Sequence, residues 1–145
     1  MYCGPCSKNY GAKLKFSGPV TKGKCFENNS LFKAAVDGAG EGLVLVVDAG
    51  GSMRCALLGG NLGASAASNG WAGNVIDGCV RDVAELAGFG LGICALGSMP
   101  LTTGKRNQGH RDVPVQIQGV SVRPGDWLYA DEDGMVVMSA AAVSA

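Results

Sequence analysis

Two consecutive glycines precede a predicted helix in the sequence Gly59-Gly60-Asn61-Leu62. The first backbone N–H groups of a helix have no partner inside the helix, and the helix dipole favours an anion beside them. Glycine has no side chain to keep an anion at a distance. The segment could therefore bind a carboxylate. A turn followed by a helix cap accounts for the same residues equally well, so the residues alone leave both interpretations open.

The adjacent residues Arg81 and Asp82 could act on such an anion. A carboxylate is a hard oxygen ligand for Mg²⁺, which keeps most of its waters when a protein binds it. The guanidinium group of Arg81 has planar donors that suit a carboxylate or an enolate. Considered alone, such a pair is usually a surface charge pair at the start of a helix. Glu85 lies one helical turn further on, where it could orient Arg81 or belong to a solvated helix face.

Other candidate centres fit their surroundings less well. Cys3-Gly4-Pro5-Cys6 has the spacing of a thioredoxin redox centre, but neither the strand nor the helix that such a centre needs is predicted around it. His110 is the single histidine, which excludes a multi-histidine metal cluster, and its glycine-containing loop predicts a solvated position. The other cysteines lie in or beside apolar stretches and are expected to be buried thiols: Cys25, Cys55, Cys79 and Cys94.

The sequence predicts a scaffold of alternating short strands and helices for these residues. Continuous apolar runs indicate strands buried on both faces, and helical segments are expected to end at glycine or asparagine. The expected elements are strands over 15–26, 42–47, 53–58 and 91–96, a strand centred on Val75 and Ile76 that ends at Asp77-Gly78, and helices over 31–36, 61–68 and 80–86.

The C-terminal part has a β pattern. Val113, Val115 and Ile117 alternate with other residues, and Asp133-Gly134 predicts a hairpin turn before a strand over 135–138. The segment 97–111 is expected to be a surface loop. The whole chain, 1–145, is therefore predicted to be a single mixed α/β domain.

Two aspartates are expected at strand ends, Asp48 and Asp77. Aspartate commonly forms turns by accepting a hydrogen bond from the backbone a few residues on. Turn formation is therefore the favoured role of both residues. A supporting position behind a functional site is the alternative.

Composition limits the classes of function. Twelve basic and twelve acidic residues give a formal net charge of zero, which argues against direct binding to nucleic acid. The longest apolar run, 43–47, is too short to cross a bilayer, and the first residues lack the pattern of a signal peptide. We therefore expect a cytoplasmic protein with no membrane partner. The 24 glycines are scattered along the chain, which is typical of turns and close backbone contacts.

Several short motifs are specific in combination, although each alone is weak. They are Val46-Val47-Asp48-Ala49-Gly50-Gly51-Ser52, Ala56-Leu57-Leu58-Gly59-Gly60-Asn61-Leu62, Gly70-Trp71-Ala72-Gly73, Asp77-Gly78-Cys79-Val80-Arg81-Asp82, Arg111-Asp112-Val113-Pro114-Val115, Pro124-Gly125-Asp126 and Ala130-Asp131-Glu132-Asp133-Gly134. With them the sequence resembles the RraA-like family over nearly its whole length, from Phe16 to Val137.

The resemblance implies a compact α/β fold of mixed sheets and helices related to the swivelling phosphohistidine domain, assembled as a homotrimer or a hexamer. In the family's enzymes a divalent cation, Mg²⁺ or Mn²⁺, assists cleavage of a carbon–carbon bond in a 2-oxo acid. Carried onto this sequence, the resemblance makes Arg81 and Asp82 catalytic, with Asp82 holding the metal. It places the substrate carboxylate at Gly59, Gly60, Asn61, Leu62 and Arg81.

One position departs from the aldolase pattern. That pattern resembles an Asp, twenty residues, and then Arg-Asp, and Gly60 stands where the first Asp would be. Several RraA-type sequences also have a small residue there. The departure favours oxaloacetate decarboxylation over aldol cleavage, because decarboxylation depends more on charge stabilisation than on a general base.

Two functions follow from the resemblance. The first is a metal-dependent lyase that gives pyruvate, either by decarboxylating oxaloacetate or by aldol cleavage of 4-hydroxy-4-methyl-2-oxoglutarate. The alternative is a regulator that binds and inhibits an RNA-degrading enzyme by protein–protein contact, which zero net charge permits. A third family label, menaquinone methyltransferase, has little support because the glycine-rich nucleotide fold expected of such an enzyme is not predicted.

Overall fold

The computed structural model describes residues 2–4, 8–24, 30–51, 53–101, 110–111, 115–117, 120–123 and 125–139. None of the helices in this part of the chain has both the length and the apolar character needed to cross a membrane. The helices are α1 (Ser30–Val36), α2 (Gly60–Ser68) and α3 (Val83–Leu86). The strands are β1 (Tyr2–Gly4), β2 (Lys8–Asn9), β3 (Phe16–Lys24), β4 (Val44–Asp48), β5 (Ala56–Leu58), β6 (Gly73–Val80), β7 (Gly92–Ser98), β8 (His110–Arg111), β9 (Val115–Ile117), β10 (Val120–Val122), β11 (Trp127–Ala130) and β12 (Met135–Met138).

Within the described residues, ten strands form one mixed sheet, and β9 and β10 form a separate antiparallel pair. The main path runs β1-β12-β11-β3-β4-β6-β7-β2, with β5 beside β6 and β8 beside β3. β3 joins two different parts of this sheet, because its first half is antiparallel to β11 and its second half is parallel to β4. The parallel strands β3, β4, β6 and β7 are thus continuous with an antiparallel β11–β12 hairpin.

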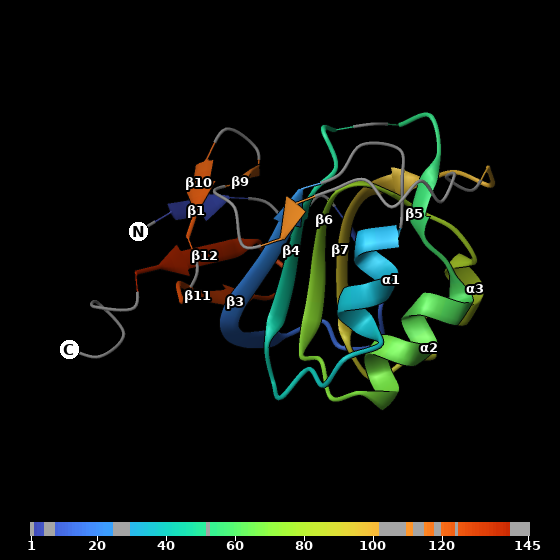
Figure 1. The fold of residues 1–145 in the computed structure, drawn as a ribbon, viewed down its shortest axis with the longest axis horizontal. Coiled ribbons are helices and arrows are strands. Elements are labelled where there is room, and N and C mark those ends of the chain that lie inside the picture. Colours follow the sequence, from blue (N-terminus) through green and yellow to red (C-terminus); the bar gives the residue numbers. More distant parts are fainter. Residues whose placement is uncertain are drawn as a thin grey trace.

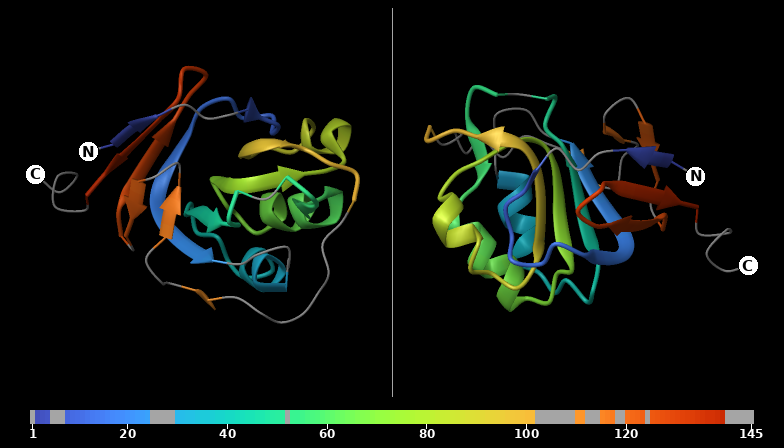
Figure 2. Two further views of the ribbon diagram at one scale, coloured as in Figure 1. Left: turned by 90° about the horizontal axis from the view of Figure 1, so that it is seen from above. Right: turned by 180° about the vertical axis from the view of Figure 1, so that it is seen from behind.

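Helices and the hairpin cover opposite faces of the parallel strands, as Figures 1 and 2 show. Side chains alternate along β4: Leu45 and Val47 belong to one buried cluster, and Val44 and Val46 belong to another. This alternation is the expected result of a strand whose two faces are both buried. The continuous apolar run in the sequence therefore has a direct structural cause.

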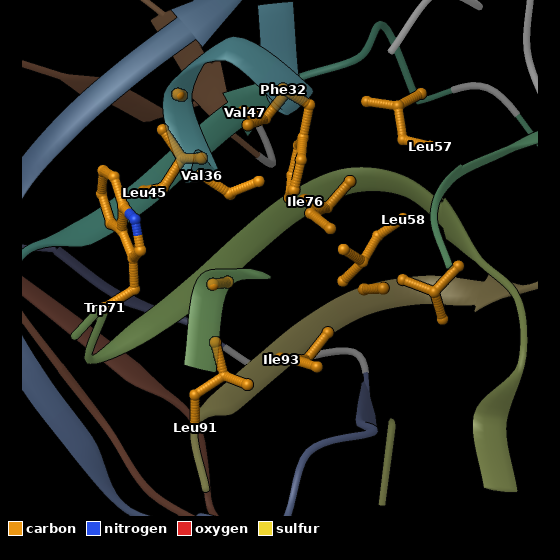
Figure 3. Close-up of a cluster of buried hydrophobic side chains, with 14 of the residues drawn as sticks. Phe32, Val36, Leu45, Val47, Leu57, Leu58, Trp71, Ile76, Leu91 and Ile93 are labelled. Carbon is orange, nitrogen blue, oxygen red and sulfur yellow. The ribbon is translucent and has the colours of Figure 1, made fainter. Parts of the chain in front are cut away.

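The larger cluster lies between the sheet and the helices (Figure 3). Phe32 and Val36 of α1 meet Leu45 and Val47 of β4, and Trp71 lies in the same cluster. Phe32 and Val36 have relative exposures of 1% and 0%. Complete burial of a side chain of this size contributes about 1.5–3 kcal/mol. This packing fixes α1 and the neighbouring α2 against the sheet, whose strands β5 and β6 lead into Gly59 and Arg81.

The second cluster joins the other face of the parallel strands to the hairpin. Leu128 and Met135 from β11 and β12 pack with Val44, Val46 and Val75. The N–H of Asp131 donates to the carbonyl of Gly134 at 3.0 Å, which closes the hairpin turn. The Asp133-Gly134 hairpin is therefore confirmed.

Several predicted elements are confirmed with small shifts of their bounds. α1 and α2 lie within one residue of the predicted helices, and β4 lies within two residues of the predicted strand. The mixed α/β class is also confirmed. The predicted strand over 53–58 is wrong at its start, because strand pairing begins only at Ala56.

The prediction that a strand ends at Asp77-Gly78 is wrong. β6 continues to Val80, and the pairing with β7 shifts register between Ile76 and Cys79. Asp77 and Gly78 therefore mark an irregularity inside the strand rather than its end, as is common where a β-bulge re-aims the following residues. The predicted helix over 80–86 is correspondingly short, since Val80 is still in β6 and α3 starts at Val83.

The predicted loop over 97–111 is wrong at both ends. Gly97 and Ser98 extend β7, and His110 and Arg111 form β8 by pairing with Lys24 and Gly23 of β3. Because β8 is only two residues long and strongly polar, period-two patterning could not reveal it. The rest of that segment, 102–109, lies outside the described residues, as does the side chain of His110.

The cysteines divide differently from the prediction. Cys55 and Cys79 are buried thiols, as expected, but Cys94 is disulfide-bonded. The prediction of a thiol at Cys94 is therefore wrong, although its burial is confirmed. Cys3 lies in β1, a strand that was not predicted, and the next described element after Cys6 is strand β2 rather than a helix. Cys25 and Cys6 lie outside the described residues.

Candidate functional site

The site begins where β5 leads into α2. Gly59 has an extended backbone, φ −123° and ψ −169°, and Gly60 is the first residue of the helix. Gly59 has no side chain with which to cap the helix, so the first N–H groups of α2 depend on partners from elsewhere. Asn61 is exposed, whereas Leu62 is half-buried and packs against the helix-side core. Leu62 therefore fixes the first turn of α2 to the core between the sheet and the helices.

Arg81 and Asp82 follow the last residue of β6. The N–H of Arg81 donates to the carbonyl of Leu58 at 2.8 Å, which ties the end of β6 to the end of β5. Asp82 has a left-handed backbone, φ 58° and ψ 44°, a conformation that few residues other than glycine adopt. Its Oδ2 does not cap α3 but accepts a hydrogen bond from the N–H of Gly60 at 2.9 Å. The start of α2 and the end of β6 thus form one site.

Gly59 gives Arg81 and Asp82 room to lie against the backbone. A Cβ added at Gly59 would lie 2.9 Å from Arg81 Nε and 3.0 Å from Asp82 Oδ2. Cβ contacts this short are rarely seen in proteins, so either the side chains or the turn would have to move. The backbone of Gly59 is not left-handed, so space rather than φ explains the glycine.

Gly60 gives room to a different group. A Cβ added there would overlap Glu85 Oε2, would lie 2.9 Å from Glu85 Cδ, and would make only an ordinary 3.5 Å contact with Asp82 Oδ2. Glu85 is exposed and is carried by α3. Its carboxylate therefore extends over the first turn of α2. The sequence suggested that Glu85 orients Arg81, but no hydrogen bond or ion pair joins them among the described residues.

The structure brings four of the six predicted site residues into direct proximity. Gly59, Gly60, Arg81 and Asp82 meet through the hydrogen bond and close approaches given above. Asn61 follows on the first turn of α2 with its side chain in solvent. The sequence motifs did not predict that the carboxylate of Glu85 would lie against Gly60. The available signal was a glycine at the start of one helix and an acidic residue on the next helix.

Asp48 and Asp77 lie apart from this hydrogen-bonded group. Asp48 Oδ1 accepts from the N–H of Gly50 at 2.9 Å, so Asp48 forms the expected turn. Asp77 lies inside β6, where burial, and to a lesser extent the charge of Asp48, raises the pKa of its carboxyl group. No hydrogen bond among the described residues links either aspartate to Arg81 or Asp82.

The donor set suits a cation that needs few protein ligands. Asp82 is exposed, and the hydrogen bond from Gly60 uses one of its two carboxylate oxygens. Among the described residues, no three His, Cys, Asp or Glu side chains gather as a metal cage. Mg²⁺ is commonly held by one or two carboxylates and retains several waters. A single aspartate with a second carboxylate nearby therefore fits Mg²⁺ or Mn²⁺ better than a cation that needs a closed cage.

A separate hollow of about 770 Å³ lies at the start of β3 and the β11–β12 hairpin. Phe16, Tyr129 and Met135 line it together with Lys15 and Asp131. It contains none of the residues of the Gly59–Asp82 site. This hollow and the side chains of Arg81 and Asp82 therefore lie in different parts of the molecule.

Comparison with known proteins assigns the family. The model of the RraA-like family, described as Aldolase/RraA, matches residues 4–137. The chain belongs to the RraA-like family. A relative from Albidiferax ferrireducens, named "Putative 4-hydroxy-4-methyl-2-oxoglutarate aldolase", is 64% identical over 141 residues, which span 92% of this chain and 82% of the relative. The resemblance inferred from the motifs is thus confirmed.

Solved structures agree with the family assignment. The structure of the RNA-processing inhibitor RraA from Thermus thermophilis is 43% identical, with a TM-score of 0.92 over 94% of this chain and 84% of that one. A structure from Geobacillus kaustophilus, described as an S-adenosylmethionine:2-dimethylmenaquinone methyltransferase, is 39% identical, with a TM-score of 0.91 over 100% of this chain and 88% of that one. The RraA-like fold expected from the sequence is therefore confirmed, while the names given to these similar proteins differ.

Proposed function

We propose that this RraA-like protein is a divalent-metal-dependent lyase that cleaves a carbon–carbon bond of a 2-oxo acid and gives pyruvate. The observation that carries the proposal is the bond from the Gly60 N–H to the carboxylate of Asp82. It holds Asp82, in a left-handed backbone, beside Arg81 and the start of α2. Backbone strain of this kind is often found at functional sites, where the surrounding structure compensates for its cost.

Cleavage of such a bond leaves the enolate of pyruvate, so the site must stabilise negative charge on the former keto oxygen. The guanidinium group of Arg81 supplies donors and a permanent positive charge for this purpose. The N–H groups of Asn61 and Leu62 have no acceptor inside the helix and suit the substrate carboxylate. Asp82 would hold Mg²⁺ or Mn²⁺, which when bound supplies further positive charge at the developing enolate.

Two substrates fit this arrangement. Oxaloacetate loses carbon dioxide from a carboxylate that is already ionised, so charge stabilisation is sufficient. Aldol cleavage of 4-hydroxy-4-methyl-2-oxoglutarate also needs a base to remove a hydroxyl proton. The 64% identical relative bears the name of the second activity. We propose that both reactions use the same Arg81 and Asp82.

Pyruvate release tests this function directly. We expect purified protein with Mg²⁺ to release pyruvate from both acids, and we expect excess chelator to abolish the release and added Mn²⁺ or Mg²⁺ to restore it. Arg81→Ala and Asp82→Asn proteins, checked for native folding by circular dichroism, serve as matched inactive controls. Release at equal rates by wild type and both variants would contradict the proposal.

A regulator of ribonuclease activity is the second candidate, and a specific similarity favours it. The 43% identical Thermus thermophilis structure is described as an RNA-processing inhibitor. A regulator would act by contact with the ribonuclease protein, because a net charge of zero gives no attraction to RNA. Inhibition of a ribonuclease that persists in Asp82→Asn would favour this function over the lyase.

We also propose that the chain forms a homotrimer, or a hexamer made of two trimers, in the cytoplasm. The support is the family membership together with an aromatic pair on β11, where the ring of Tyr129, a residue that is 42% exposed, lies 6.3 Å from the ring of the half-buried Trp127. Light scattering should give three or six times the monomer mass of 14.7 kDa. A single monomer mass at micromolar concentration would contradict this assembly.

A further inference from the structure

We propose that Glu85 is the general base of aldol cleavage at this site. The inference rests on the proposed lyase function and adds a residue to it. It starts from the space in front of Gly60, which the carboxylate of Glu85 occupies. The side chain of any larger residue at position 60 would overlap this carboxylate. A glycine at this position therefore has a chemical consequence, because it admits a carboxylate from another helix.

Two carboxylates lie close to this space. From the position of a Cβ on Gly60, Glu85 Cδ lies at 2.9 Å and Asp82 Oδ2 at 3.5 Å. Asp82 is engaged by the N–H of Gly60. The side chain of Glu85 has no hydrogen bond or ion pair with any other described residue, so its carboxylate is available to accept a proton. The two acidic groups thus have different roles, one fixed and one free.

Arg81 lies on the neighbouring side of the same turn. Its Nε is 2.9 Å from the position of a Cβ on Gly59, one residue before the glycine that faces Glu85. A substrate whose carboxylate meets the first turn of α2 would therefore have a positive group towards Gly59 and a free carboxylate towards Gly60. Charge stabilisation and proton removal need groups of these two kinds on the same substrate.

The reaction balances with Glu85 as the only proton acceptor. Its carboxylate removes the proton of the hydroxyl group on C4 of 4-hydroxy-4-methyl-2-oxoglutarate, and the electrons of that O–H bond form the C4 carbonyl. The C3–C4 bond breaks, and its electron pair enters the enolate of the first pyruvate. The carboxyl group of Glu85 then returns the proton to C3 of the enolate, so that one substrate gives two pyruvates and the glutamate is regenerated.

Oxaloacetate decarboxylation provides the internal comparison. Its C3–C4 bond breaks with loss of carbon dioxide from an ionised carboxylate, and no proton has to be removed first. A general base is worth about 10²–10⁴ in rate where one is needed. Removal of Glu85 should therefore depress aldol cleavage far more than decarboxylation, whereas a residue that only shapes the site would depress both together.

The test measures both reactions in Glu85→Gln, Glu85→Ala and the exposed control Glu132→Gln on the β11–β12 hairpin. In Glu85→Gln we expect kcat for aldol cleavage to fall at least about 100-fold relative to kcat for decarboxylation. Formate should restore part of the aldol activity of Glu85→Ala, because a small carboxylate can enter the vacated space. Magnesium titration by calorimetry should show binding by Glu85→Gln, and Glu132→Gln should match wild type in every measurement.

The outcomes separate this assignment from the lyase function. If Glu85→Gln lowers both reactions equally, or neither, Glu85 is not the base although the lyase stands. If wild type decarboxylates oxaloacetate but does not cleave the aldol substrate, the assignment again fails alone. If wild type releases no pyruvate from either acid, the proposed function fails and the assignment fails with it.

Discussion

Two pairs of acidic residues show different uses of the carboxylate group. Asp48 accepts its hydrogen bond from Gly50, two residues away, and Asp77 lies nearby in β6 with a raised pKa. Asp82 accepts from Gly60, 22 residues away, and has Arg81 beside it and Glu85 across the same turn. The first pair shapes a local turn, whereas the second joins two elements around an open helix start.

The comparison shows that distant partners, rather than the number of carboxylates, distinguish the candidate site. Asp48 is satisfied by the turn that it forms. Asp82 is held in a left-handed conformation by contacts from another part of the chain, and only one of its oxygens is used in doing so. Substitutions in the two pairs should therefore affect different properties.

The largest expected effect is that of Arg81→Ala. Removal of one preorganised donor to a developing oxyanion typically costs about 10²–10³ in kcat. We expect a loss of this size for pyruvate release from both substrates, with little change in thermal stability, because Arg81 is only half-buried. Steady-state kinetics and a melting curve check the prediction, and wild-type turnover in a folded variant would contradict it.

Asp82→Asn should weaken Mg²⁺ binding by at least about tenfold and lower turnover with it. Asparagine tolerates the left-handed backbone and can still accept from the Gly60 N–H, so the fold should persist. Asp48→Asn is the matched control from the other pair, and its metal affinity should equal that of wild type. Isothermal titration calorimetry with Mg²⁺ compares the two, and equal weakening in both variants would remove the distinction between the pairs.

The two glycines sharpen the comparison within the site. Gly59→Ala should lower both reactions about 10- to 100-fold, because its Cβ would displace Arg81 and Asp82 and small misplacements of reacting groups are costly. Gly60→Ala should displace only the flexible end of Glu85, so aldol cleavage should fall more than decarboxylation. Kinetics on both substrates would refute this difference if the ratio of aldol cleavage to decarboxylation were the same in the two alanine variants.

The smallest expected effect concerns Asp77. Because folding raises the pKa of its carboxyl group above the ordinary 3.8, the folded protein binds protons more tightly than the unfolded chain does. The contribution of Asp77 to the free energy of unfolding therefore falls as pH rises from about 4 through the raised pKa, and it stays unfavourable at neutral pH.

Asp77→Asn should remove this dependence and give a small gain in stability at pH 7 that disappears below pH 4. Urea denaturation of both proteins at a series of pH values measures the difference, and kinetics at pH 7 should be like those of wild type. A gain that grows towards acid pH would mean that the sign of the pKa shift is wrong.

The sequence by itself determined the family, the α/β class and the residues that carry the candidate chemistry. The apolar run of β4 and the glycine-ended α1 follow from local patterning, and so does the hairpin at Asp133-Gly134. Arg81 and Asp82 are neighbours in the chain, so no folding was needed to place them together. Patterning could not show the two-residue β8 or the disulfide of Cys94, because both depend on partners distant in sequence.

Only the tertiary structure decided which groups meet around Gly60. β5 and β6 pair in parallel, with Leu58 opposite Val80, so the residues after both strands emerge at the same edge of the sheet. Local signals placed the end of β6 at Asp77-Gly78, and an end there would have left Arg81 and Asp82 further along a helix. The register shift within β6 instead carries the strand on to Val80, where the turn that follows brings Asp82 to the N–H of Gly60 and Glu85 over its α-carbon.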